Sequence, residues 1–160
     1  MFRDMRRKEK EVTKDEVIKI LEEAEYGILA TFGEGEYPYA IPLNYVYYND
    51  CIYFHCAKEG LKLDNIKSNE KVSFCVVGRT KLLPENFSTA YESVVAYGRA
   101  EVIEGEEKTN ALELIIKRFS KEFVNEGLEY IKRGGDRTAV VKINIEKLTG
   151  KRSRPEDLEE

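Results

Sequence analysis

The chain contains a single histidine, His55, within a segment from Tyr53 to Lys62 that combines several groups able to take part in chemistry. An imidazole with its ordinary pKa of about 6.5 can give or take a proton near neutral pH. Lys58 and Lys62 add positive charge, and Gly60 lets the backbone approach a bound group closely. The segment runs from an expected strand end into a helix start, whose free N–H groups attract anions. It predicts either a phosphate site beside His55 or an ordinary turn with solvated lysines.

A second unusual segment runs from Tyr37 to Tyr45 and carries Pro38 and Pro42 within a strand-like pattern. Proline has no N–H, so a strand that contains it leaves neighbouring backbone groups without partners. The polar edge of a flat heteroaromatic ring could bind to those groups. An irregular edge strand explains the same pattern without a ligand, and the tyrosines could instead pack a subunit interface.

Composition excludes several classes of protein. The three cysteines, Cys51, Cys56 and Cys75, lack Cys-x-x-Cys spacing, so neither a disulfide framework nor a metal site is expected. The 26 basic and 30 acidic residues give a net charge of −4, which argues against a nucleic-acid or membrane partner. No apolar run of about 18 residues is present, and residues 1–11 lack a signal-peptide core, so we expect a cytoplasmic protein.

The length of 160 residues, 42% of them hydrophobic, suits one domain, expected over 13–150, between a basic arm at 1–12 and a charged, exposed tail at 151–160. A capping box of Thr13 and Glu16 predicts a helix that begins at Lys14. A loop is expected at 78–90, and the first three strands should form a meander. Helices are expected at 14–25, 58–69 and 106–120, with a weaker turn at 126–132, and strands at 26–32, 37–48, 51–56, 71–77, 91–103 and 138–145.

Six mostly sequential strands with short connections favour antiparallel pairing, and closure into a barrel removes the exposed edges. The predicted fold class is therefore α+β, a six-stranded antiparallel β-barrel with peripheral helices.

Taken in their order along the chain, the sequence segments described above resemble those of flavin-binding split-barrel proteins of the pyridoxamine 5′-phosphate oxidase family. The chain looks most like the 5-nitroimidazole antibiotic-resistance (nitroimidazole reductase) branch, over about Arg3 to Arg152. The residues that carry the resemblance include Met5-Arg6-Arg7-Lys8, Gly27 to Thr31, Tyr37 to Tyr48, Ile52 to Gly60, Lys71 to Val77, Tyr91 to Ala100 and Leu148 to Arg152.

The resemblance implies a homodimer with FMN at the subunit interface, which passes electrons from a reduced nicotinamide to a small acceptor such as a nitroimidazole. His55 would be the catalytic residue near the flavin ring. Many relatives carry His or Arg where this chain has Leu61, which cannot bind a phosphate. The implied cofactor-binding residues are Ile41, Pro42 and Leu43 along the ring, His55, Cys56 and Ala57 beside the ribityl chain and phosphate, Lys58 and Lys62 near the phosphate, and Ser93 and Val95 from the partner subunit.

Two other functions remain open from the sequence. The same fold could serve a non-catalytic flavin or haem carrier or a redox sensor, which Leu61 favours slightly because it suits a loosely held cofactor. A ligand-free barrel that binds RNA or a protein is the other, although the negative net charge argues against RNA.

Overall fold

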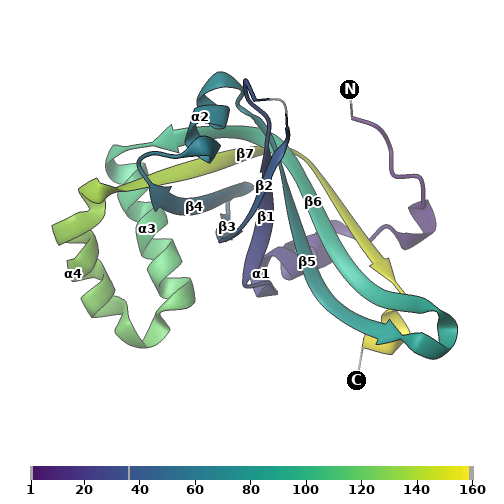
Figure 1. Cartoon of the computed structure of the whole chain (residues 1–160). Coiled ribbons are helices and arrows are strands. Elements are labelled where there is room, and N and C mark those ends of the chain that lie inside the picture. The colour runs from purple at the N-terminus through teal and green to yellow at the C-terminus, as the bar shows by residue number, and fades with distance from the viewer. Residues whose placement is uncertain (1, 36, 159–160) are drawn as a thin grey trace.

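The fold is built on one antiparallel sheet, seen in a computed structural model that describes residues 2–35 and 37–158. Figure 1 shows its long, curved strands with helices at the periphery. The strands of the described chain are β1 Tyr26–Thr31, β2 Tyr39–Asn44, β3 Val46–Tyr48, β4 Cys51–Ala57, β5 Lys71–Leu83, β6 Ser88–Ile103 and β7 Thr138–Ser153. Their order in the sheet is β2-β1-β5-β6-β7-β4-β3.

The two edges of this sheet, β2 and β3, are joined in the chain by a single residue, Tyr45. Strand β2 pairs with β1, whereas β3 pairs with β4, so the chain changes partner at Tyr45 and the sheet closes on itself. The Tyr45 side chain is fully buried, and its hydroxyl donates to the Leu21 carbonyl over 2.7 Å. Its ring meets the edge of Phe74 at 4.9 Å between centroids. The predicted α+β barrel is confirmed, and the strand expected at 37–48 is divided in two by this bend.

The strands at the far end of the sheet are longer than predicted. The loop expected at 78–90 is wrong, because β5 continues to Leu83 and β6 begins at Ser88, with a 3₁₀ turn over Pro84–Asn86 between them. A shift of register between Val77 and Thr80 lets the pairing continue. These residues form strands because each segment pairs with the other, and a local sequence pattern rich in polar residues does not show that pairing.

The C-terminal segment is also more ordered than expected. Strand β7 does not end at Ile145 but runs to Ser153, pairing with β6 along its length. The prediction that the tail from Lys151 is exposed is wrong, because Ser153 and Leu158 are buried. The N-terminal arm lies against the same strand, where Glu11 bridges to Lys151.

The four α-helices of the described chain surround the sheet (Figure 1). The capping box of Thr13 and Glu16 is present, and α1 buries Val17, Ile20 and Leu21 in the barrel core. None of these helices is long and apolar enough to cross a membrane. Their bounds are α1 Lys14–Glu23, α2 Leu61–Ser68, α3 Gly105–Phe119 and α4 Val124–Gly134.

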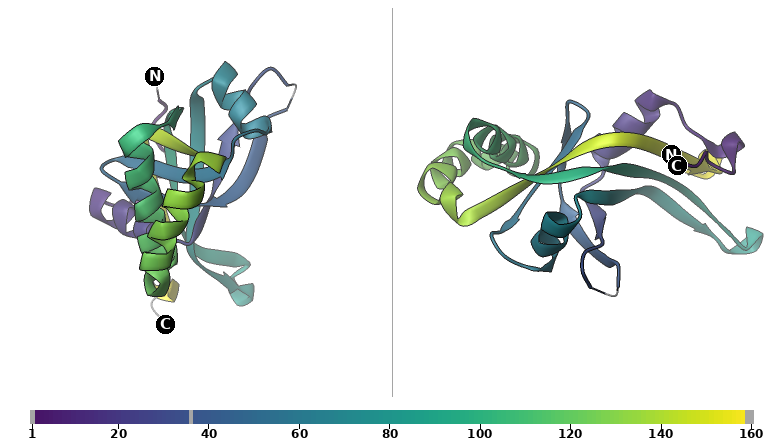
Figure 2. Two further views of the ribbon diagram at one scale, coloured as in Figure 1. Left: turned by 90° about the vertical axis from the view of Figure 1, so that its left-hand side faces the viewer. Right: turned by 90° about the horizontal axis from the view of Figure 1, so that it is seen from above.

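Helices α3 and α4 lie side by side at one end of the molecule (Figure 2). The turn expected at 126–132 is a full helix, α4, because it packs on α3. Gly127 allows the close approach, since a Cβ there would lie 2.7 Å from the Ile116 side chain. Helix α3 also buries Leu112 and Ile115 in a second apolar cluster that includes Tyr53, and Ile131 of α4 packs against it.

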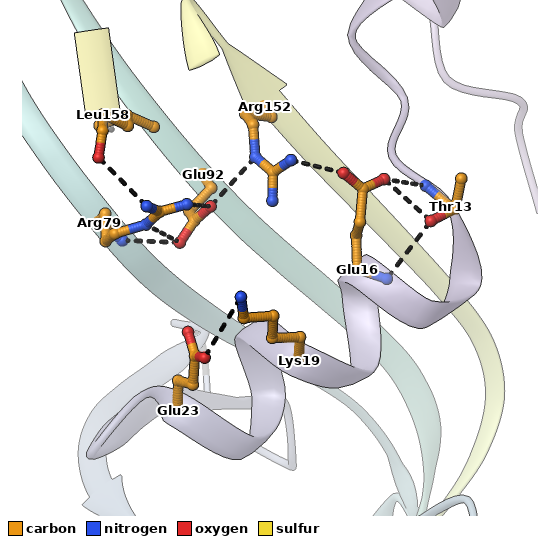
Figure 3. Close-up of polar contacts among 8 residues, drawn as sticks. All are labelled: Thr13, Glu16, Lys19, Glu23, Arg79, Glu92, Arg152 and Leu158. Carbon is orange, nitrogen blue, oxygen red and sulfur yellow. Dashed lines mark hydrogen bonds and ion pairs between the residues drawn. The ribbon is translucent and has the colours of Figure 1, made fainter. Parts of the chain in front are cut away.

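A buried carboxylate, Glu92 on β6, ties the long strands to α1 and to the C-terminus (Figure 3). Its oxygens accept from Arg79 Nε at 3.0 Å and Arg152 Nε at 3.1 Å. Arg152 also pairs with Glu16, and Arg79 donates to the Leu158 carbonyl over 3.1 Å. A buried charge is stable only with such partners, so this cluster fixes the relative positions of five segments: β5, β6, β7, α1 and the turn at Pro155–Leu158.

We expect Glu92→Gln to lower the free energy of unfolding by about 3 kcal/mol, because removal of one buried charge leaves its partners uncompensated. The exposed pair of Lys19 and Glu23 on α1 provides the control: Glu23→Gln should cost less than about 0.5 kcal/mol. Urea denaturation measures both. Equal costs for the two variants would show that the Glu92 cluster does not stabilise the fold.

The same cluster predicts a pH dependence. Burial alone would raise the pKa of Glu92, but the hydrogen bonds and charges of Arg79 and Arg152 outweigh it and hold the pKa below the ordinary 4.5. The stabilisation is therefore complete above pH 4.5 and is lost as pH falls through the lowered pKa. The difference in unfolding free energy between wild type and Glu92→Gln should shrink as urea denaturation is repeated below pH 4.5. A constant difference would contradict this.

Candidate functional site

The strands predicted to bind the cofactor meet on the outer face of the barrel. Pro42, Ile28, Cys75, Val95 and Thr149 are paired in turn across β2, β1, β5, β6 and β7, and we call them the outer row. Pro42 is exposed and the other four are half-buried. Two of the predicted residues, Pro42 and Val95, therefore share one row. Ser93 lies on the same side of β6 as Val95, because strand side chains alternate.

A second row of mostly small side chains lies beside the outer row. It consists of Ala40, Ala30, Ser73, Tyr97 and Lys147, paired across the same five strands. A groove of about 580 Å³ runs along part of this row, over Ala30, Ser73 and Tyr97. Its floor is a sheet surface with small side chains, which a flat ring or a second protein surface could approach closely.

The predicted residues next to Pro42 have a different environment. Ile41 and Leu43 pack against the barrel core, so their side chains do not share the outer face with Pro42. Cys56 also packs against the core, and burial raises the pKa of its thiol, while Lys62 opposes that shift. Only the backbone of these three residues could meet a ligand on the outer face.

The segment between β4 and α2 keeps the features predicted for an anion site. Gly60 precedes α2 with φ 131°, a conformation that favours glycine, and no side chain caps the helix there. A Cβ at Gly60 would meet nothing within 4 Å, so the helix start faces open space. Ala57, Lys58 and Leu61 are exposed here, and Lys62 is half-buried. The first N–H groups of α2 and two lysines are thus available together.

The two lysines differ in their surroundings. Lys58 lines a groove of about 810 Å³ whose other charged walls include Asp64, Glu101 and Glu104. Lys62 does not line that groove and is close enough to Cys56 to influence its thiol. An anion at the start of α2 would therefore meet less competing negative charge beside Lys62 than beside Lys58.

His55 lies on the opposite side of β4 from Cys56, facing α3 and α4. It lines a cavity of about 180 Å³ together with Leu112, Ile115, Tyr130 and Ile131. One side of His55 is exposed, while the cavity walls remove water from the other and lower the pKa of the imidazole below 6.5. The ring is therefore mainly neutral at pH 7. The sequence predicted a helix at 106–120 and a weaker turn at 126–132, but it did not reveal that both lie against His55.

Cysteine and metal chemistry add little to this picture. Cys51, Cys56 and Cys75 are free thiols. Within residues 2–35 and 37–158, no three His, Cys, Asp or Glu side chains come together in a way that could hold a metal ion.

Comparison with known proteins agrees with the resemblance found in the sequence. The family described as pyridoxamine 5′-phosphate oxidase matches residues 13–152. A candidate 5-nitroimidazole antibiotic resistance protein of Bacteroides thetaiotaomicron is 26% identical, with a TM-score of 0.71 over 88% of this chain and 85% of that one. No curated protein sequence matches.

Two more distant structures share the fold. A conserved hypothetical protein of Mycobacterium tuberculosis has a TM-score of 0.81 at 17% identity, over 98% of this chain and 95% of that one. A FAD- and haem-binding protein of Mycobacterium smegmatis has a TM-score of 0.74 at 19% identity, over 91% of this chain and 74% of that one.

The environment of His55 predicts its titration. The midpoint should lie below 6.5, because the cavity walls disfavour the charged imidazolium. As the single histidine of the chain, it gives one imidazole signal in an NMR titration. Ile131→Ser, which admits water to the cavity, should move the midpoint towards 6.5. A wild-type midpoint at or above 6.5 would be inconsistent with this environment.

Proposed function

Because the chain belongs to the pyridoxamine 5′-phosphate oxidase family, we propose that it is an FMN-binding oxidoreductase that passes electrons from a reduced nicotinamide to a small acceptor. A nitroimidazole or another nitro-aromatic is the acceptor that the Bacteroides relative suggests. The observation that carries the proposal is the uncapped start of α2 between Lys58 and Lys62. A cytoplasmic location goes with this function.

The donor set at the start of α2 fits the phosphate of FMN. Free N–H groups of a helix start and the positive end of its dipole bind phosphate, and Gly60 leaves the approach open. Lys62 adds a charge-assisted contact, with Lys58 nearby. Leu61 contributes no polar group, so the backbone has a larger share in binding than it would beside an arginine.

The outer row supports the homodimer. Its side chains are apolar or small and are not fully buried within one chain, as expected of a surface that a second copy covers. In such a dimer Ser93 and Val95 of one protomer would border the flavin bound by the other. The backbone of Ile41, Pro42 and Leu43 would lie along the flavin ring.

His55 has the properties of a proton donor or an orienting group for the acceptor. Flavin, when bound, supplies the electron transfer from nicotinamide to acceptor, and the protein binds, orients and tunes it. With its pKa below 6.5, the neutral imidazole of His55 can hold or accept a hydrogen bond at pH 7, or pass on a proton.

A second candidate is a non-catalytic flavin or haem protein on the same fold. It is favoured by the Mycobacterium smegmatis protein, which binds FAD and haem, and by a flavocytochrome of Azotobacter vinelandii with a TM-score of 0.64. Purified protein with a haem Soret band, or with bound flavin that no nicotinamide reduces, would favour this candidate over the reductase.

We expect the purified protein to be yellow, to release FMN on acid treatment, and to regain it from solution. Lys62→Gln should weaken FMN binding by about tenfold through loss of one charge-assisted contact. Fluorescence titration of the apoprotein with FMN measures this. The matched control is Lys67→Gln, an exposed position on the same helix, which should leave FMN binding unchanged.

A protein that neither contains nor takes up flavin would refute the proposal, and release of FAD instead would refute the choice of FMN. If wild type and Lys62→Gln bound FMN with equal affinity, the phosphate site would not lie beside Lys62 at the start of α2.

The dimer predicts the effect of a charge in the outer row. Val95→Arg should weaken self-association by about tenfold or more, because two buried arginines would face each other. Sedimentation analysis measures this. Val102→Arg, at an exposed position on the same strand outside the outer row, is the control and should remain dimeric. A Val95→Arg variant that is fully dimeric would exclude the outer row as the interface.

A further inference from the structure

The cavity that His55 lines is small, mainly apolar and only partly open. Side chains of α3 and α4 form much of its wall, among them Leu112, Ile115 and Ile131, and Thr138 at the start of β7 also lines it. Its volume is about 180 Å³. An apolar cavity of roughly 150 Å³ in a protein is known to stay dry and to take up benzene.

The lining also limits the charge of an occupant. Among the lining side chains that the structure describes, none carries a full charge at neutral pH, since His55 is mainly neutral there. A carboxylate or an ammonium group would lose its hydration in this cavity without gaining an ionic partner. His55 and the phenol of Tyr130 offer hydrogen bonds to a neutral polar group.

We propose that this cavity binds a small, uncharged, ring-sized molecule, one polar group of which makes a hydrogen bond to His55. The α3–α4 pair then determines which molecules enter, by size and by charge. The identification of this molecule as the electron acceptor rests on the proposed function. The binding itself follows from the cavity alone.

Gly135, at the end of α4, controls the space in the cavity. A Cβ at Gly135 would lie 3.5 Å from Ile131 Cγ2 and 3.9 Å from Leu112 Cδ1, which are ordinary contact distances to two of the walls. Its φ of −57° is open to any residue. Gly135→Ala and Gly135→Val should therefore fold, and each added methyl group should occupy room that the ligand needs.

The test uses the protein as purified, labelled with ¹³C-histidine, so that His55 gives a single imidazole signal. Nitrobenzene is titrated as the neutral probe and 4-nitrobenzoate as its charged counterpart. We expect a saturable shift of the His55 signal with nitrobenzene and at least about tenfold weaker binding of 4-nitrobenzoate. Gly135→Ala should weaken nitrobenzene binding and Gly135→Val should weaken it further. Asn125→Leu, which adds an apolar side chain to an exposed position of α4, should bind as wild type does.

The proposal is overturned if nitrobenzene gives no saturable shift, if 4-nitrobenzoate binds equally well, or if Gly135→Val binds like wild type. Should the Gly135 variants not fold, the comparison of the two probes on wild type still decides. Flavin absorbance of the same samples reports the proposed function separately. A protein without flavin that binds nitrobenzene refutes the oxidoreductase and leaves the cavity site intact.

Discussion

Closure of the sheet at Tyr45 is the constraint on which the rest of the structure depends. The segment at 39–48 supplies both edges of the sheet, because β2 pairs with β1 on one side of Tyr45 and β3 pairs with β4 on the other. The Tyr45 hydroxyl could not be buried without a partner, and the Leu21 carbonyl provides it, so α1 is held against the barrel at the bend. Burial makes this phenol harder to ionise, raising its pKa, and keeps it a hydrogen-bond donor.

This closure divides the chemistry of the chain among three environments. Alternation along β4 directs His55 towards α3 and α4, and directs its neighbour Cys56 towards the core. Alternation along β2 leaves Pro42 on the outer face between two core-packed residues. Residues that are adjacent in the sequence therefore lie on different surfaces of the barrel. The proposed cofactor site and the proposed acceptor site are accordingly formed by different side chains and backbone groups of the same segments.

Much of the fold could be predicted from local signals, such as the capping box at Thr13 and the apolar repeat of α3. The family was recognised from motifs in sequence order. Extension of β5 to Leu83 and of β6 back to Ser88 was missed, because these segments are held as strands by pairing with each other, which a local sequence pattern does not show. The turn expected at 126–132 is a longer helix for a similar reason: α4 is stabilised by packing on α3, a contact that short-range periodicity does not describe.

The order of strands in the barrel has a consequence for how the chain reaches this structure. Cys51 on β4 contacts Asn144 on β7 across a separation of 93 residues, and β7 is the strand that lies between β4 and β6 in the sheet. Such distant pairings slow folding, since the intervening chain must be ordered before the contacts form. During synthesis the six strands that precede β7 therefore keep an open edge at β4 until β7 has left the ribosome. Early truncation of the chain would expose that edge permanently, as a template for aggregation.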